Sequence, residues 1–166
     1  MRLGIDFGTT RIVVAAEDRG NYPVAAFDCP DGAAREWVPP LVAVRGEERL
    51  YGWDAWAAQG LDGVTAVRSI KRILAECGPE THLELGGQTV AIGQVLGEML
   101  ASVRESILER STLGVKPDEP LEAMLGVPAN ANSNQRFLTV EGFRSAGFQI
   151  LGLLNEPSAA SIETSH

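Results

Sequence analysis

The sequence predicts an α/β fold built on a mixed β-sheet, and two patterns carry this prediction. Three apolar segments at about 2–7, 11–17 and 22–27 are joined by tight turns, which is typical of an antiparallel meander. The middle segment is nearly all apolar, so we expect it to be buried. The last third instead places a helix between strands 121–127 and 148–154. Such a unit pairs its strands in parallel, so one sheet should contain both kinds of pairing.

The middle of the chain, about 29–113, is predicted to be an α+β subdomain inserted at the edge of this sheet. The core then comprises about 1–28 and 114–166. The elements expected in the insertion are strands at 37–44 and 49–51, helices at 53–60 and 64–76, a hairpin at 83–91 turning on Gly86 and Gly87, and a long helix at 92–113 ending at Gly114.

The composition indicates a folded, acidic protein. The chain has 166 residues, of which 45% are hydrophobic, which suits one domain of ordinary size. The net charge of −8 with scattered Lys and Arg argues against a nucleic-acid partner. The sequence shows neither a signal peptide nor a membrane span, and Cys29 and Cys77 lack CxxC spacing. We therefore expect a cytoplasmic protein with reduced thiols and no membrane partner.

Residues 4–10 end a predicted strand in a glycine and two threonines, a pattern that suits a phosphate. Gly8 lacks a Cβ, so backbone N–H groups can approach an anion and the chain can take positive φ. Thr9 and Thr10 offer hydroxyl and amide donors. Asp6, expected to be buried in the strand, would orient the water shell of a metal. An ordinary hairpin with a capped buried acid explains the same residues, and neither a Walker A loop nor a GxGxxG motif occurs.

Two further residues are candidates for phosphate chemistry. Lys71 lies beside the apolar face of the predicted helix 64–76, although a single lysine on an amphipathic helix is usually just solvated. Glu156 follows an apolar strand and precedes a proline, which places it where open α/β sheets bind ligands. The alternative for Glu156 is an acid stabilised by a helix dipole. Asn132 and Gln135 resemble a capping pair, which explains them without any function.

Taken in order, these segments resemble the nucleotide-binding domain of the seventy-kilodalton heat-shock chaperones of the DnaK type, within the actin and sugar-kinase superfamily. The resemblance covers essentially the whole chain and corresponds to the first of two lobes. It implies the actin-like ATPase (ribonuclease H-like) fold, with the second phosphate loop, the adenosine-binding residues and the peptide-binding domain lying outside this chain. The matching segments are residues 4–10, 70–72, 127–129, 135–136 and 155–160.

The resemblance implies that the chain binds the phosphates of ATP with Mg²⁺. In the turn at 8–10, the two threonines would contact the β- and γ-phosphates, and Asp6 would coordinate magnesium through water. Lys71 would stabilise charge on the γ-phosphate, and Glu156 would position or deprotonate the attacking water. Phosphoryl transfer needs little covalent help from the protein, so a cation, a metal and an oriented water suffice.

In the resembled family, the residues matching Pro128 and Arg136 relay the nucleotide state towards the peptide-binding domain. The chain departs from the family at two places in these motifs. Arg11 stands where an Asn usually follows the second Thr, and Asn130 and Ala131 replace an aromatic pair. The resemblance therefore implies a divergent member, in which the phosphate contacts and the relay are tuned differently.

The resemblance also implies an activity and partners for the intact protein: ATP hydrolysis that gates the binding of unfolded peptide clients, assisted by co-chaperones. The isolated chain is expected to be inactive, because nucleotide affinity depends on both lobes. The face left uncovered by the second lobe would favour a dimer. Two alternatives remain open, namely a sugar or small-molecule kinase of the same superfamily and an interaction or filament module that does not hydrolyse ATP.

Overall fold

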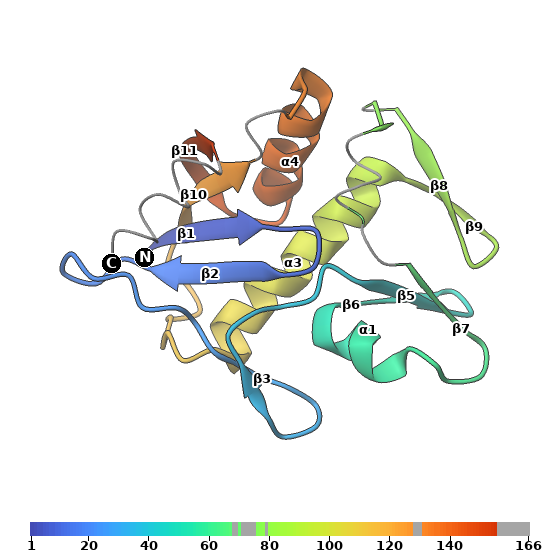
Figure 1. Ribbon diagram of the computed structural model, residues 1–166, viewed down its shortest axis with the longest axis horizontal. Coiled ribbons are helices and arrows are strands. Elements are labelled where there is room, and N and C mark those ends of the chain that lie inside the picture. The colour runs from blue at the N-terminus through green and yellow to red at the C-terminus, as the bar shows by residue number, and fades with distance from the viewer. Residues whose placement is uncertain (68–69, 71–75, 79, 128–130, 156–166) are drawn as a thin grey trace.

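A four-stranded sheet forms the core of the molecule, and it combines antiparallel with parallel pairing (Figure 1). The computed structural model describes residues 1–67, 70, 76–78, 80–127 and 131–155. The spatial order is β11-β10-β1-β2, so the predicted mixed sheet is confirmed. The pairs are β1 (Arg2–Phe7) antiparallel with β2 (Ile12–Ala16), β1 parallel with β10 (Glu122–Val127), and β10 parallel with β11 (Gln149–Asn155).

One face of the amino-terminal strands carries the hydrophobic core. In β1, Leu3, Ile5 and Phe7 are buried, as the period of two in a strand requires. In β2, buried residues alternate with partly buried ones. The prediction that this segment is buried holds for Ile12, Val14 and Ala16, whereas Val13 and Ala15 lie on the other face of the strand and are only partly buried.

The third strand of the predicted meander, at 22–27, is reduced to local contacts. Val24 forms an isolated bridge with Ala15, and the carbonyl of Pro23 accepts the N–H of Ala16 at 3.0 Å. Pro23 has no N–H to return a bond, so the ladder cannot continue. The chain forms instead a two-residue pair between β3 (Phe27–Asp28) and β4 (Ala34–Arg35).

Two long helices pack against the sheet and against each other. α3 (Ile92–Arg110) runs behind β1 and β2 in the view of Figure 1, and α4 (Ser133–Ser145) lies beside it. Their contact is close: a Cβ built on Gly142 would lie 2.8 Å from Cγ of Leu96. A glycine in the interior of α4 is therefore required by packing.

The long helix ends earlier than its sequence pattern predicts. The last helical residue is Arg110, whereas the prediction continued the helix to residue 113. Ser111 takes extended geometry, donates its hydroxyl to the carbonyl of Ile107 at 2.6 Å and accepts the N–H of Leu113 at 3.2 Å. A serine cap therefore ends the helix ahead of Gly114.

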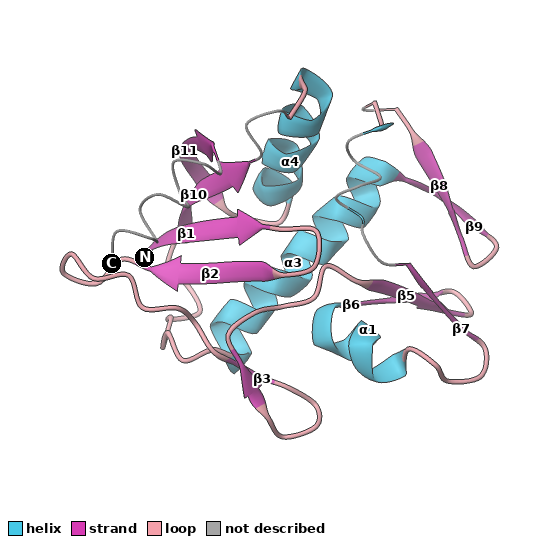
Figure 2. Cartoon of the chain, in the orientation of Figure 1, coloured by secondary structure: helices cyan, strands magenta, loops and turns pink. Residues whose placement is uncertain are grey.

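Short strands make up much of the region predicted as an insertion, and in Figure 2 they lie to the right of α3 while β10 and β11 lie to the left. The predicted hairpin on Gly86 and Gly87 is confirmed, and both glycines have positive φ, at 53° and 84°. The elements are β5 (Val42–Arg45), β6 (Glu48–Tyr51), α1 (Gly52–Ala58), β7 (Val64–Val67), β8 (His82–Leu85) and β9 (Gln88–Ala91).

The predicted helix 64–76 is wrong at its start. Val64–Val67 is a strand that pairs antiparallel with β5, giving a three-stranded sheet in the order β6-β5-β7. Three of its four residues are β-branched, which favours a strand. Pairing with β5 therefore decided the structure, although the apolar residues recur with the helical period of about 3.6 residues. Ile70 is helical and fully buried.

Most buried side chains of the sheet, the long helices and the middle of the chain form one continuous cluster, and Leu41, Ala43 and Ala55 form a second, smaller one. The boundaries near 29 and 113 remain a prediction. Cys29 and Cys77 are buried free thiols, as expected. Within the described residues, we find no helix long and apolar enough to cross a membrane.

A network of polar side chains ties β6 to α3. Arg49 donates to both carboxylate oxygens of Glu98, at 2.8 and 2.7 Å, and Tyr51 donates its hydroxyl to the same carboxylate at 2.6 Å. Gln88 and Gln94 complete the network from β9 and α3. The Arg49 guanidinium lowers the pKa of Glu98 to about 2, with smaller contributions from the Tyr51 and Gln94 hydrogen bonds.

We predict that Glu98→Gln destabilises the protein at neutral pH by about 1–2 kcal/mol, a figure reduced for the partial exposure of this pair. Because the folded-state pKa lies below the ordinary 4.5, the stabilisation is present above pH 4.5 and is lost as the pH falls towards 2. Urea unfolding at pH 7 and pH 3 should show the variant losing less stability on acidification than wild type. Glu105→Gln, at an exposed position on the same helix, is the control and should leave the free energy of unfolding unchanged at both pH values. The prediction is contradicted if E98Q and wild type lose the same stability between pH 7 and pH 3.

A second prediction concerns the contact between α3 and α4. Gly142→Ala should destabilise the protein by about 1–3 kcal/mol, because the new methyl overlaps Leu96 and this outweighs the gain of about 1 kcal/mol in helix propensity. Gly93→Ala on α3 is the matched control, since a Cβ there meets nothing within 4 Å, and it should be neutral or stabilising. Thermal unfolding of both variants measures the difference, and a stabilised G142A would show that the two helices are not in close contact.

Candidate functional site

The candidate site lies at the carboxyl ends of β1 and β10, beside the turn that joins β1 to β2. Parallel pairing places Asp6 opposite Gly126, so the end of the first strand and the end of β10 meet at one edge. The amino-terminal end of α4 lies near the end of β10 in Figure 1. Open α/β sheets bind ligands at this edge, which makes it the candidate site.

The turn after β1 is closed by a backbone hydrogen bond from the N–H of Gly8 to the carbonyl of Arg11, at 2.8 Å. Gly8 does not have positive φ, contrary to one reason given for it from the sequence. A glycine is needed there because a Cβ would lie 2.7 Å from the Arg11 carbonyl oxygen. Thr9 and Thr10 are exposed, and no hydrogen bond within the described part of the chain occupies their hydroxyls. These donors are available to a ligand.

Asp6 is exposed, and the expectation that it is buried was wrong. In β1 the odd-numbered Ile5 and Phe7 point into the core, so Asp6 faces the opposite side of the sheet. Gly126 lies next to it on β10, and a Cβ at that glycine would come within 3.7 Å of the Asp6 carboxylate. An exposed carboxylate at this edge can bind water or a hydrated cation without the cost of burying a charge.

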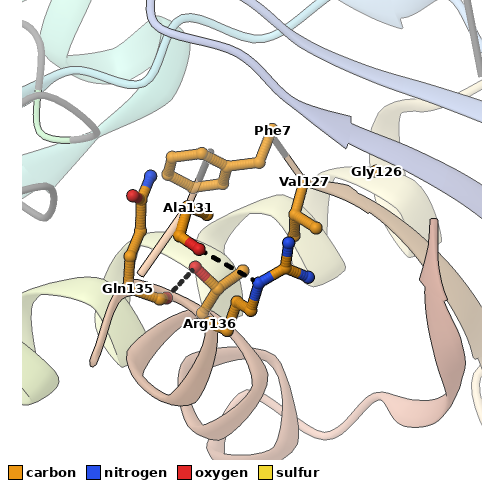
Figure 3. A pocket seen from close by; sticks show the side chains of 7 residues that line it. Phe7, Gly126, Val127, Ala131, Gln135 and Arg136 are labelled. Atoms are coloured by element: carbon orange, nitrogen blue, oxygen red, sulfur yellow. Dashed lines mark hydrogen bonds between the residues drawn. The ribbon is translucent and has the colours of Figure 1, made fainter. Parts of the chain in front are cut away.

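The start of α4 borders the same edge. The side chain of Asn132 caps the helix by accepting the backbone N–H of Gln135 at 2.8 Å, which confirms the Asn132 half of the predicted capping pair. Arg136 is half-buried, and its Nε donates to the carbonyl of Ala131 at 3.2 Å (Figure 3). The candidate relay residue is therefore held by the segment that leads into the helix.

A small hollow lies between the ends of β1 and β10 and the first turns of α4 (Figure 3). Sequence reasoning missed most of its lining, because the side chain of Gln135 is buried in the hollow while only its backbone takes part in the cap. The sequence offered one signal for this lining, namely Gly126 inside a strand, because a glycine there often marks a place where a ligand or another backbone segment comes close. The lining residues are Phe7, Gly126, Val127, Ala131, Gln135, Arg136 and Thr139.

Three predicted site residues, Lys71, Pro128 and Glu156, lie outside the described residues. The structure brings Asp6 next to Gly126 and places Arg136 with Phe7 and Gly126 at the hollow. The convergence of Lys71 and Glu156 on this edge stays a prediction. Among the described side chains, no three acidic, histidine or cysteine residues cluster as metal ligands.

Aromatic contacts beside the turn were also missed. The guanidinium carbon of Arg11 lies 4.7 Å from the ring centroid of Trp37. Trp37 in turn packs on Trp53 and Trp56, with centroids 4.6 and 6.0 Å away. These partners come from segments far apart in the sequence, so no local pattern predicts them.

Several known proteins are similar to this chain in sequence. No protein-family model matches the chain. It is 33% identical over 180 residues to the chaperone protein HscA homolog of Burkholderia multivorans, with 98% of this chain covered. It is also 28% identical to the chaperone protein DnaK of Deinococcus deserti, with 96% covered. The chain belongs to the heat-shock-70 chaperone family.

Membership of the heat-shock-70 family agrees with the order of motifs in the sequence. A third relative, the HscA homolog of Colwellia psychrerythraea, is 29% identical over 177 residues and covers 96% of the chain. The chain spans only 27–28% of the length of these curated chaperones.

We predict that Gly8→Ala destabilises the protein by about 1–3 kcal/mol, because its methyl and the Arg11 carbonyl cannot share the space inside the turn. The matched control is Gly4→Ala in the preceding strand, where a Cβ meets nothing within 4 Å and the effect should stay below about 1 kcal/mol. Denaturant unfolding of both variants measures the difference. Equal effects would mean that the turn is open.

Proposed function

We propose that the chain is the first lobe of the ATPase domain of a heat-shock-70 chaperone, with the actin-like fold. The observation that carries the proposal is the turn at 8–10, whose hydroxyls are available beside the exposed carboxylate of Asp6. The family membership and the mixed sheet support it. Peptide clients and co-chaperones would be bound by parts of the protein beyond these residues, in the cytoplasm.

The proposed binding mode places the nucleotide phosphates against the turn. The backbone N–H groups and hydroxyls of Thr9 and Thr10 would donate to phosphate oxygens, which suits an acidic protein that must bind an anion through local donors. Phosphate binding through these local donors does not require a positively charged patch on the protein surface.

The described residues fit a magnesium ion held mainly through water and phosphate. Mg²⁺ keeps several waters and takes one or two carboxylates besides substrate phosphates, and Asp6 offers such an exposed carboxylate. When bound, the ion would neutralise charge on the phosphates. The part of the chain that the structure describes has no cluster of three ligands, so an all-protein cage is not what these side chains suit.

Lys71 and Glu156 take their proposed roles from the family resemblance. The ammonium of Lys71 would stabilise negative charge on the γ-phosphate, and the carboxylate of Glu156 would orient the attacking water and accept its proton. A sugar kinase of the same superfamily is not favoured, since the relatives are named as chaperones.

The test is ATP hydrolysis by the full-length protein. Lys71→Ala should lower the single-turnover rate with MgATP by about 10²–10³-fold, because it removes the group that stabilises transition-state charge. Glu156→Gln should lower it by about 10²–10⁴-fold, because the amide cannot accept a proton. The rate of phosphate release measures both.

Matched controls are Lys116→Ala and Glu105→Gln, which remove the same charges far from the motif segments and should leave the rate unchanged. If K71A hydrolyses ATP as fast as K116A, the catalytic assignment fails. A wild-type protein that binds ATP but never hydrolyses it would favour the interaction or filament module.

A further inference from the structure

We propose that Arg11 binds a phosphate oxygen of the nucleotide and that Trp37 is the positioning residue that holds its guanidinium. This inference rests on the proposed function and adds a phosphate ligand, Arg11, that the family pattern does not contain. Where that pattern has Asn after the second Thr, this chain places a permanent cation.

The backbone of Arg11 is part of the phosphate turn. Its carbonyl accepts the N–H of Gly8 at 2.8 Å and so closes the turn that presents Thr9 and Thr10. The next residue, Ile12, exchanges two backbone hydrogen bonds with Val38, at 2.8 and 2.9 Å. The chain at Arg11 is therefore fixed from both sides, and its side chain starts from a defined point.

The side chain of Arg11 is supported by an aromatic cluster. Its guanidinium lies over the ring of Trp37, one residue before the bridge partner Val38. Trp37 is itself fixed, because it packs on Trp53 and its carbonyl accepts the indole N–H of Trp53 at 2.9 Å. Trp53 is 6% exposed and belongs to α1, so the support reaches into the core of the inserted region.

A cation–π contact with a ring uses no N–H donor of the guanidinium, so those donors can still bind an anion. Arg11 is exposed, and among the described residues its guanidinium has no hydrogen bond or ion pair. A cation held in place, with donors available and its backbone in the phosphate turn, has the properties of an anion ligand. In a chain of net charge −8, such a cation also offsets repulsion of the nucleotide.

The test uses the full-length protein and compares MgATP with adenosine, which has no phosphate. Arg11→Asn, which restores the family pattern, should weaken MgATP binding about tenfold and leave adenosine binding unchanged, because it removes one charge-assisted hydrogen bond. Trp37→Leu keeps the charge but removes its support, and it should weaken MgATP binding about threefold. Titration calorimetry measures these affinities, and Arg45→Asn, on an exposed hairpin away from the turn, should match wild type.

A spectroscopic signal gives an independent readout. The chain has three tryptophans, and all belong to the cluster beside Arg11. Addition of MgATP should change their emission in wild type, and the change should be lost in R11N while the unfolding temperature stays within a few degrees. For this readout, tryptophans elsewhere in the full-length protein are replaced by phenylalanine.

The outcomes separate the two proposals. If wild type binds MgATP and R11N binds it as tightly, or if R11N weakens MgATP and adenosine equally, the inference fails and the proposed function stands. If wild type binds no MgATP, both fail.

Discussion

The parallel pairing of β1 with β10 is the interaction on which the arrangement of this molecule depends. It joins the first strand to one that follows more than a hundred residues later, and it brings Asp6 next to Gly126. At the opposite end, the amino group of Met1 donates to the carbonyl of Pro120 at 2.8 Å and forms an ion pair with Glu119 at 3.0 Å. The ammonium lowers the pKa of Glu119. With one end of the pair anchored by charge and backbone, the register at the other end places Asp6 beside Gly126, just ahead of the turn at 8–10.

The two faces of the β1 strand differ, since one is apolar and buried and the other carries the exposed Asp6. The face bearing Leu3, Ile5 and Phe7 contributes to the core that includes α3, so the alternate residues must face away from it. Asp6 is exposed for this reason, and Gly126 leaves room beside it. The exposure of Asp6 is thus a consequence of packing on the other side of the sheet, and these strands contribute to the core without burying its charge.

Sequence reasoning succeeded where local chemistry decides the structure. The Gly86-Gly87 hairpin, the cap of Asn132 and the strand–helix–strand unit all follow from residues close in the chain. It failed where distant partners decide. Val64–Val67 has helical spacing but pairs with β5. The burial of Asp6 was misjudged because distant segments such as α3 decide which face of the strand is covered. The contact of Arg11 with Trp37 has no local pattern at all.

The Gly8 turn shows how a correct residue can be chosen for the wrong physical reason. Positive φ would make glycine necessary for backbone freedom, and a substitution would then only strain one residue. The observed cause is a 2.7 Å approach to the Arg11 carbonyl, so the glycine is necessary because of its neighbour. Changes at position 8 therefore act on Arg11 as well, whose backbone closes the turn while its side chain rests on Trp37. In this chain the turn, the guanidinium of Arg11 and the ring of Trp37 are therefore joined by direct contacts, from the backbone hydrogen bond of Gly8 to the cation–π contact.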